Sequence, residues 1–155
     1  MDASSFRTVL GHFASGVVIV TGASPGGPLG FTCQSFFSVS LDPPLVAIAP
    51  GRVSTSWPPI HETGRFCVNV LTEDQESLSR SFAVSGGEKF SGVGWTPGPS
   101  GSPVLTGCLA WIDCTVAAVH DAGDHLLVLG RVSEMGYSNG RPLLFYRGGF
   151  GSFQA

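Results

Sequence analysis

The fold is decided by one stretch of the chain, Gly30-Phe31-Thr32-Cys33-Gln34-Ser35-Phe36-Phe37-Ser38-Val39-Ser40-Leu41-Asp42-Pro43-Pro44. From position 31 to 41 the odd-numbered residues are apolar except for Ser35, and the even-numbered residues are polar except for Phe36. An alternation with period 2 predicts a single β-strand that buries its odd-numbered face. Asp42-Pro43-Pro44 should end this strand, because proline has no N–H to donate to a sheet and forces the preceding residue into an extended conformation.

The polar face of this predicted strand carries no charge. It presents only hydroxyl and amide groups, on Thr32, Gln34, Ser38 and Ser40. A strand that faces bulk water usually carries lysine, glutamate or arginine as well. Uncharged donors and acceptors on a rigid strand suit a neutral, polar, planar ligand. We therefore interpret the strand as a candidate binding site.

The composition predicts one domain, residues 1–155, that associates with a second copy. A chain of 155 residues is long enough to bury a substantial core. Only 12% of its residues are charged, which is about half the average for globular proteins. A small monomer with so few charges would expose much apolar surface. We therefore expect a homodimer with a buried two-fold interface.

Charge and hydropathy exclude two classes of partner. The formal net charge is −3 and no cluster of lysine and arginine occurs, so nucleic acid is not expected as a partner. No apolar run of about 18 residues and no basic, then apolar, leader pattern is present, so we expect no membrane association and a cytoplasmic location. The cysteines fit a reducing compartment, because they form no C-x-x-C pair; they are Cys33, Cys67, Cys108 and Cys114.

The remaining patterns predict a mainly β protein with two or three peripheral helices. Helical signals occur at 3–14, at the end of the loop 50–62, and after the capping-box sequence Thr72-Glu73-Asp74-Gln75. Further strands are expected at 17–21, 45–49, 65–71, 109–119, 126–134 and 143–147, with the pair 109–119 and 126–134 joined as a hairpin. About seven short strands with helices at the periphery indicate a β-barrel or a β-sandwich.

Three alternative sites lack a necessary feature. The glycine-rich segment 22–28 follows an apolar strand, but the helix that a dinucleotide-binding turn requires does not follow, so we interpret it as a hairpin turn. Cys108 and Cys114 lie on one predicted strand, roughly 20 Å apart at about 3.3 Å per residue, so they cannot converge on one zinc ion with His120 and His125. No G-x-S-x-G motif or carboxylate pair supports a hydrolase.

Three further features are open to a functional or an ordinary structural interpretation. Ser54-Thr55-Ser56, beside Arg52, either caps a helix or holds an anion with hydroxyl groups and free backbone N–H groups. His125 follows Gly123-Asp124 at a hairpin tip and is functional only if it faces the same cleft as the strand 30–41. Tyr146-Arg147-Gly148-Gly149 places an aromatic ring and a cation at the end of a strand.

Taken together, these segments resemble the short-chain flavin reductases, the small NAD(P)H:flavin oxidoreductases that serve two-component monooxygenases. The order and spacing of the segments carry the resemblance along nearly the whole chain: Phe6-Arg7 with Gly16, Thr32-Cys33-Gln34-Ser35-Phe36, Ser38-Val39-Ser40-Leu41-Asp42-Pro43-Pro44-Leu45, Ser54-Thr55-Ser56, 65–71, Lys89-Phe90, Gly123-Asp124-His125 and 142–148. Cys33 stands where alanine is common in that family.

The resemblance implies a split β-barrel of the Greek-key, FMN-binding type, forming a homodimer with the flavin near the subunit interface. The ligand that it implies is FMN or FAD. The ring and ribityl chain of the flavin would contact Thr32, Cys33, Gln34, Ser35, Phe36, Ser38 and Val39. The flavin phosphate would contact Ser54, Thr55 and Ser56, and Lys89 and Phe90 would close over the flavin. The resemblance places NADH or NADPH against His125, Phe145, Tyr146, Arg147 and Gly148. No metal site is implied.

The function expected on this basis is hydride transfer from a nicotinamide to FMN or FAD, with the reduced flavin passing to a flavin-dependent monooxygenase. The two rings need only to be held face to face, so no catalytic side chain is required, and His125 is the one candidate. One alternative is a flavin- or haem-binding barrel that acts as a carrier or sensor without turnover. A second, an oxidase of the pyridoxamine-phosphate type, should carry more than the eight basic residues present.

Overall fold

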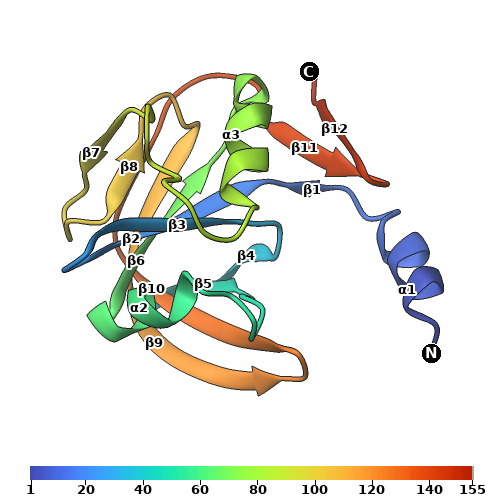
Figure 1. Ribbon diagram of the computed structural model, residues 1–155, viewed down its shortest axis with the longest axis horizontal. Coiled ribbons are helices and arrows are strands. Elements are labelled where there is room, and N and C mark those ends of the chain that lie inside the picture. Colours follow the sequence, from blue (N-terminus) through green and yellow to red (C-terminus); the bar gives the residue numbers. More distant parts are fainter. Residues whose placement is uncertain (155) are drawn as a thin grey trace.

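The computed structural model of the chain describes residues 1–154 (Figure 1). Its helices are α1 (Ala3–Leu10), α2 (Trp57–Thr63) and α3 (Glu76–Phe82), the last preceded by the 3₁₀ turn η1 (Glu73–Gln75). Its strands are β1 (Ser15–Gly16), β2 (Val18–Ser24), β3 (Gly27–Cys33), β4 (Phe36–Leu41), β5 (Pro44–Ile48), β6 (Arg65–Val70), β7 (Trp95–Pro97), β8 (Pro103–Leu105), β9 (Ala110–Ala122), β10 (His125–Tyr137), β11 (Leu143–Tyr146) and β12 (Gly149–Ser152). The predicted mainly β class is confirmed.

One antiparallel sheet of seven strands dominates the molecule, in the order β3-β2-β6-β9-β10-β5-β4. Its two edge strands, β3 and β4, are consecutive in the chain and are joined by Gln34 and Ser35 alone. The sheet must therefore curl strongly, because two residues can bridge only a short gap between its edges. Within residues 1–154, β3 and β4 do not pair with each other, so the sheet does not close.

The single strand predicted for residues 31–41 is wrong in one respect, since the structure divides it into β3 and β4. The division falls at Gln34 and Ser35, so it includes one of the two residues that broke the alternation and adjoins the other, Phe36. Cys33 is buried as predicted, but Phe37 and Leu41 are 54% and 92% exposed. The chain crosses from one sheet edge to the other at the division, and Val39 forms a bulge in β4. The burial of odd-numbered residues that begins in β3 therefore does not continue into β4.

The predicted hairpin of residues 109–119 and 126–134 is confirmed, and a second hairpin forms where Asp42-Pro43-Pro44 was expected to end a strand. β5 pairs antiparallel with β4 across the two-residue turn Asp42-Pro43, in which the peptide bond is cis. β9 and β10 pair along their whole length and turn at Gly123-Asp124, where Gly123 has a φ of +67°. The glycine-rich segment after β2 is also the hairpin turn that the sequence indicated, since Ser24 pairs with Gly27.

The strand β12 was not predicted. The chain reverses after β11 at Arg147-Gly148, whose φ values of +51° and +81° are those of a type I′ hairpin turn. Arginine is uncommon in that conformation, so the dipeptide gave no turn signal of the usual Asn-Gly kind. The four residues that follow include two glycines, which hides the strand pattern.

The predicted helices are present, but α1 is shorter than expected and stands apart. It ends at Leu10 instead of residue 14, and Asp2 caps it through the N–H of Ser4. The capping-box sequence at Thr72 starts a helical turn as predicted, where Gln75 accepts a hydrogen bond from the N–H of Thr72 at 3.0 Å, and two prolines stand in the first turn of α2. None of the helices within residues 1–154 has the length and apolar character needed to cross a bilayer.

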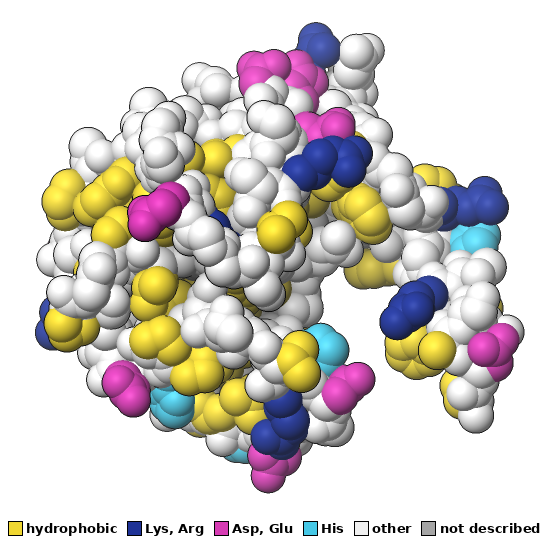
Figure 2. Space-filling view, in the orientation of Figure 1, with side chains coloured by type: hydrophobic (Ala, Val, Ile, Leu, Met, Phe, Trp, Pro, Cys, Tyr) yellow, Lys and Arg dark blue, Asp and Glu magenta, His cyan; other side chains and the backbone are white. Residues whose placement is uncertain are grey.

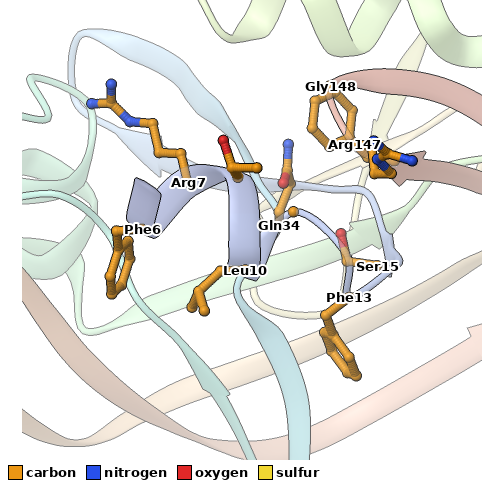
Figure 3. Close-up of a pocket in the computed structure, with 11 residues that line it drawn as sticks. Phe6, Arg7, Leu10, Phe13, Ser15, Gln34, Arg147 and Gly148 are labelled. Carbon is orange, nitrogen blue, oxygen red and sulfur yellow. The ribbon is translucent and has the colours of Figure 1, made fainter. Parts of the chain in front are cut away.

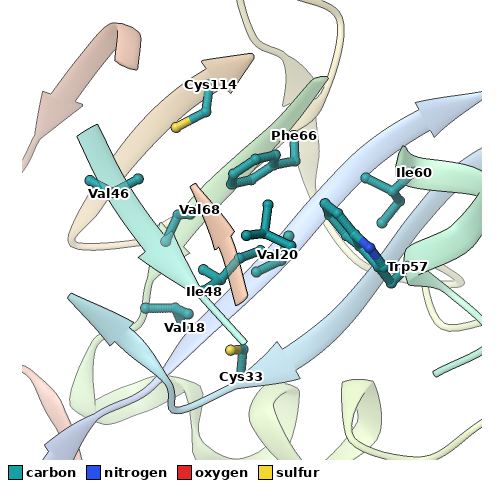
Figure 4. Packing of buried hydrophobic residues seen from close by; sticks show 11 residues of the cluster. Val18, Val20, Cys33, Val46, Ile48, Trp57, Ile60, Phe66, Val68 and Cys114 are labelled. Carbon is teal, nitrogen blue, oxygen red and sulfur yellow. The ribbon is translucent and has the colours of Figure 1, made fainter. Parts of the chain in front are cut away.

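Two hydrophobic clusters hold the sheet, one on each face of β2. Val18 and Val20 point into the larger cluster, where Trp57 and Ile60 of α2 pack on Phe66 of β6 (Figure 4). Residues on the other face of β2, such as Ile19, pack under α3 in the second cluster with Phe82 and Leu105. A strand buried on both faces explains why residues 17–20 are uniformly apolar.

Asn69 is the polar group on which the packing of β6 depends. It is fully buried; its amide nitrogen donates to the carbonyl of Ile19 at 3.1 Å, and its oxygen accepts from the N–H of Leu105 at 2.9 Å. Asn69→Ala is expected to lower the free energy of unfolding by about 3 kcal/mol, because it leaves buried backbone groups without partners. Urea unfolding measures this loss. Asn139→Ala, at an exposed turn, is the control, and an equal loss in both variants would refute the assignment.

Candidate functional site

The division between β3 and β4 lies at a cavity of about 430 Å³, which we call the inner cavity. It is lined by the predicted residues Thr32, Cys33, Gln34, Ser35 and His125, together with Phe31, Ala49, Pro50, Gly51 and Ala83. The structure thus brings His125 from the β9–β10 hairpin tip to the strand segment 32–35. This was the condition on which a functional role for His125 depended.

Hydrogen bonds already occupy the hydroxyl groups of this segment. Thr32 donates its proton to the carbonyl of Ser79 at 2.6 Å, so toward a ligand its oxygen can only accept. Ser35 donates to the carbonyl of Ala49 at 3.2 Å and accepts from the N–H of the same residue at 3.1 Å, which ties the β3–β4 crossing to the end of β5. The amide of Gln34 is the polar side chain best able to approach a ligand here, since it is exposed.

Arg52 fixes the position of the hairpin tip. Its guanidinium donates to the carbonyl of Gly123 at 2.7 Å and to the carboxylate of Asp121 at 2.6 Å, and its own N–H donates to the carbonyl of Asp124 at 3.0 Å. The expectation that Arg52 adds positive charge beside Ser54 for an anion is therefore not supported. The sequence analysis did not predict this contact. The signal that could have indicated it is Arg52 as an isolated cation, together with Asp121 and Asp124 on either side of Gly123.

His125 is oriented by its neighbour in the chain. Its Nδ1 lies 2.7 Å from the carboxylate of Asp124, and this hydrogen bond lowers the pKa of Asp124 below the usual value. The second ring nitrogen, Nε2, is the one that approaches Gly51, because a Cβ placed there would lie 3.8 Å from it. The imidazole therefore presents Nε2 to the wall of the inner cavity.

The inner cavity adjoins a second one of about 210 Å³, the middle cavity, which shares its walls Phe31, Thr32, Gly51 and Ala83. Ser54, Thr55, Ser56 and Lys89 line the middle cavity. The hydroxyl of Ser54 accepts from the N–H of Trp57 at 3.2 Å, so Ser54 caps the first turn of α2, while Ser56 is buried. Both interpretations of this segment are therefore compatible with the geometry.

Lys89 is held in place at the wall of the middle cavity. Its Nζ donates to the carbonyls of Gly30 and Phe82 at 3.1 and 3.2 Å, and partial burial lowers the pKa of Lys89. Two of the three N–H groups of the ammonium are used in this way, which leaves one for a ligand. Phe90 packs edge-on against Phe82, with ring centroids 5.0 Å apart, so it belongs to the second hydrophobic cluster and also lines a separate cavity beside Lys89.

A further cavity, which we call the α1 cavity, has a volume of about 660 Å³ and lies between α1 and the β11–β12 turn (Figure 3). Of the predicted nicotinamide residues, Phe145, Arg147 and Gly148 line it, and Gln34 connects it to the inner cavity. Tyr146 points to the other side of β11, where it lines a different cavity with Ala14 and Phe150. The structure therefore separates His125 and Tyr146 from the other three predicted residues.

The predicted contacts on β4 also lie apart from these cavities. Phe36 packs against the larger hydrophobic cluster, and Ser38 and Val39 are exposed on the edge strand. None of the three lines the inner, middle or α1 cavity. Because the chain crosses to the opposite sheet edge after Ser35, the polar face of β3 does not continue onto β4.

The four cysteines are buried free thiols. Burial raises the pKa of Cys33, Cys67 and Cys108 and raises that of Cys114 to about 12, so all four are neutral near pH 7. Residues 1–154 contain no group of three or more side chains placed to hold a metal ion. The site therefore consists of hydrogen-bonding and cationic groups rather than of a reactive thiol.

These thiols predict a loss of stability at alkaline pH. The thiols of Cys67 and Cys114 lose their protons at about pH 8.5 in the unfolded chain but keep them in the folded protein, so the free energy of unfolding is largest below that pH and falls above it. Each thiol contributes a slope of about 1.4 kcal/mol per pH unit. Urea unfolding from pH 8 to 10 should show this fall, and Cys67→Ala or Cys114→Ala should make it shallower. Unchanged slopes in both variants would contradict the prediction.

The strongly curled antiparallel sheet, with adjoining cavities beside its edges, defines the class of fold. The family comparison identifies that class. The family model described as "Flavin reductase like domain" matches residues 10–154, and the chain belongs to this family.

The chain is similar to known proteins over nearly its whole length. It is 50% identical over 153 residues to the reductase subunit HsaB of a flavin-dependent monooxygenase from Mycobacterium tuberculosis, covering 97% of this chain and 82% of the relative. It is 43% identical to the FMN reductase (NADH) SmoA of Agrobacterium fabrum, covering 98% and 87%. Nitrilotriacetate monooxygenase component B from Mycobacterium thermoresistibile superposes with a TM-score of 0.94 at 49% identity, covering 97% and 86%.

One solved relative contains nucleotide fragments. The NADH:FAD oxidoreductase SgcE6 of Streptomyces globisporus, in complex with NAD and FAD fragments, superposes with a TM-score of 0.94 at 35% identity. The match covers 99% of this chain and 93% of that one.

Proposed function

We propose that this protein is an NAD(P)H-dependent flavin reductase that reduces FMN or FAD, and that residues 1–155 form its single flavin reductase domain. The observation that carries the proposal is the groove formed by the inner and middle cavities. It begins at the uncharged segment 32–35 and ends at the hydroxyl groups and cation of Ser54, Thr55, Ser56 and Lys89. A flavin mononucleotide has the same sequence of parts, a flat polar ring at one end and a phosphate at the other.

The residues present fit such a ligand chemically. Apart from Gln34 and His125, the walls of the inner cavity are Phe31 and small residues, which suit a flat ring, and Gln34 can both donate to it and accept from it. The middle cavity supplies hydroxyl groups and the ammonium of Lys89, which suit a phosphate dianion. Thr32 can serve only as an acceptor, as its proton is engaged by Ser79.

When bound, the flavin supplies the chemistry of accepting a hydride from the nicotinamide. The protein's contribution is to hold the two rings in contact, a proximity effect that requires no acid or base from a side chain. The segment 32–35, which Ser35 ties to the end of β5, would hold the flavin ring, and His125, which lines the same cavity, would face the nicotinamide. Gln34 lines both the inner cavity and the α1 cavity, so we place the nicotinamide nucleotide on the side of Phe145, Arg147 and Gly148.

The exposed apolar surface supports a homodimer. Phe6, Leu10 and Phe13 point to the same side of the N-terminal segment (Figure 3), and these side chains are 52%, 56% and 84% exposed. Hydrophobic side chains of α1 face an open gap between this helix and the rest of the molecule (Figure 2). A second copy in that gap would cover them, together with Phe37 and Leu41 of β4.

We further propose that the curled sheet is a split β-barrel of the Greek-key type and that the reduced flavin passes to a monooxygenase partner. The two-residue connection between the edge strands supports the first point. The second rests on similarity to the reductase subunit HsaB of a flavin-dependent monooxygenase. The free buried thiols fit a reducing, cytoplasmic location.

The test of this function is flavin-dependent oxidation of NADH or NADPH by the purified protein, with FMN and FAD each supplied in turn. We expect consumption of at least one nicotinamide cofactor that depends on added flavin. Tight flavin or haem binding without any consumption in the four combinations would instead support a carrier or sensor, and the enzyme function would be wrong.

A further inference from the structure

The α1 cavity carries two arginines, Arg7 from the helix and Arg147 from the β11–β12 turn. Both residues are exposed, and no acidic side chain within residues 1–154 lines the cavity with them. The three ion pairs among the same residues involve neither arginine. Two guanidinium groups without a carboxylate between them give this cavity a positive potential, which favours an anionic ligand.

The fold brings the two arginines together through Gly11. The N–H of Arg147 donates to the carbonyl of Gly11 at 3.0 Å, and a Cβ placed on Gly11 would lie 3.8 Å from the Cα of Arg147. Arg7 precedes Gly11 by one helical turn, and its carbonyl accepts from the N–H of Gly11 at 2.9 Å. Residues four apart lie on the same face of a helix, so the side chain of Arg7 emerges on the side of α1 that meets the turn.

The backbone of Arg147 indicates that its side chain is needed. Its φ is +51°, and it is the only residue other than glycine with a positive φ within residues 1–154. Asparagine or glycine would occupy this position of a type I′ turn at a lower cost in free energy. An unfavourable conformation that is kept on the wall of a cavity points to a function for the side chain that it presents.

We propose that Arg7 and Arg147 bind the diphosphate of the nicotinamide dinucleotide, so that the N-terminal helix takes part in recognising the hydride donor. This inference rests on the proposed function, because it assumes that NADH or NADPH is that donor. The diphosphate carries two negative charges, one for each guanidinium group. Arginine suits phosphate oxygens, because its planar guanidinium can donate two parallel hydrogen bonds.

The rest of the cavity fits the remainder of a dinucleotide. Its volume is about 660 Å³, and the ring of Phe145 gives it an apolar wall for a flat base. In Figure 3 the side chains of Arg7 and Arg147 lie on opposite sides of Gln34. Because Gln34 also lines the inner cavity, a dinucleotide held by its diphosphate here could extend its nicotinamide toward the proposed flavin ring.

Two substitutions remove these charges and should preserve the fold. Arg7→Ala changes an exposed position of α1 to a strong helix former. Arg147→Asn produces an Asn-Gly dipeptide, which favours a type I′ turn, so this variant should unfold at a urea concentration equal to or above that of the wild type. Arg141→Ala is the matched control for the loss of one positive charge, because Arg141 is exposed and lies outside the cavity.

The experiment compares flavin-dependent oxidation of NADH, of NADPH and of N-benzyl dihydronicotinamide, a hydride donor without phosphate. We expect Arg7→Ala and Arg147→Asn each to raise the KM for NADH and for NADPH about tenfold and to leave kcat within about twofold. The rate with the phosphate-free donor should stay within about twofold of the wild-type rate. Arg141→Ala should behave as the wild type with all donors.

An unchanged KM for both nucleotides in both variants would overturn the proposal. An equal loss with the phosphate-free donor, or unfolding of Arg147→Asn at a lower urea concentration, would indicate a structural role for the arginine and overturn it as well. A loss confined to NADPH would place the additional phosphate of NADPH at the arginines instead of the diphosphate. In each of these cases the wild type still oxidises a nucleotide, so the proposed function survives. A wild type that oxidises neither NADH nor NADPH with either flavin would refute the proposed function, and this inference with it.

Discussion

Ser54→Asp is expected to raise the Kd for FMN about thirtyfold. The change places a carboxylate at the wall of the middle cavity, where we propose that the flavin phosphate binds. Two unit charges about 5 Å apart repel by about 3 kcal/mol near a protein surface, and solvent screening reduces this to about 2 kcal/mol. Calorimetric titration with FMN measures the effect.

The fold should survive this substitution. The hydroxyl of Ser54 accepts from the N–H of Trp57, and aspartate performs the same capping role at helix starts. Ser77→Asp adds the same charge on an exposed position of α3 and should leave the Kd for FMN unchanged. A Ser54→Asp protein that unfolds at the wild-type urea concentration and binds FMN with wild-type affinity would disprove the placement of the phosphate.

Arg52→Ala is expected to lower kcat/KM for the nicotinamide cofactor about tenfold while leaving the Kd for flavin within about twofold. Arg52 touches neither proposed ring site. It positions the hairpin tip, through Asp121 and Gly123, and thereby places His125 at the wall of the inner cavity. Losing these two contacts frees the tip, although the backbone hydrogen bond from position 52 to Asp124 remains.

The pattern of kinetic changes distinguishes positioning from general destabilisation. Arg52→Lys keeps the charge opposite Asp121 but cannot make both contacts, so partial recovery of kcat/KM is expected. Arg65→Ala, at an exposed position of β6, is the control and should behave as the wild type. An equal loss of flavin affinity in Arg52→Ala, or no change in kcat/KM, would show that the hairpin tip does not position a residue for contact with the nicotinamide.

Local chemistry made much of this fold predictable. The capping box at Thr72 and Gln75, the prolines that open α2 and the turn at Asp42-Pro43 are short-range signals that fix the backbone on their own. The β9–β10 hairpin followed from two long apolar patterns around a glycine-containing tip. These features depend on residues close in the chain, so no tertiary information is needed to predict them.

The errors arose where the tertiary structure overrides the local pattern. The alternation from Phe31 to Leu41 contains no sign that the chain crosses between sheet edges, apart from the irregularity at Ser35 and Phe36. That crossing is why Ser38 and Val39 lie apart from the groove, whereas Thr32 and Gln34 line it.

Partners of single charged residues were equally hard to predict. Arg52 lies two residues from Ser54 in the chain, which suggested a shared anion site. In the structure it contacts Asp121, which is 69 residues away. Long-range pairs of this kind depend on the register of the sheet, which the amino-acid pattern alone does not specify.

The central claim, that this protein holds a flavin and a nicotinamide in contact, is tested most directly by mixing the protein with flavin and NADH in the absence of oxygen. We expect the visible absorption of the oxidised flavin to bleach much faster than in a protein-free mixture, and the Ser54→Asp and Arg52→Ala proteins to slow this bleaching. A flavin that binds to the protein but stays oxidised with both NADH and NADPH would contradict the account.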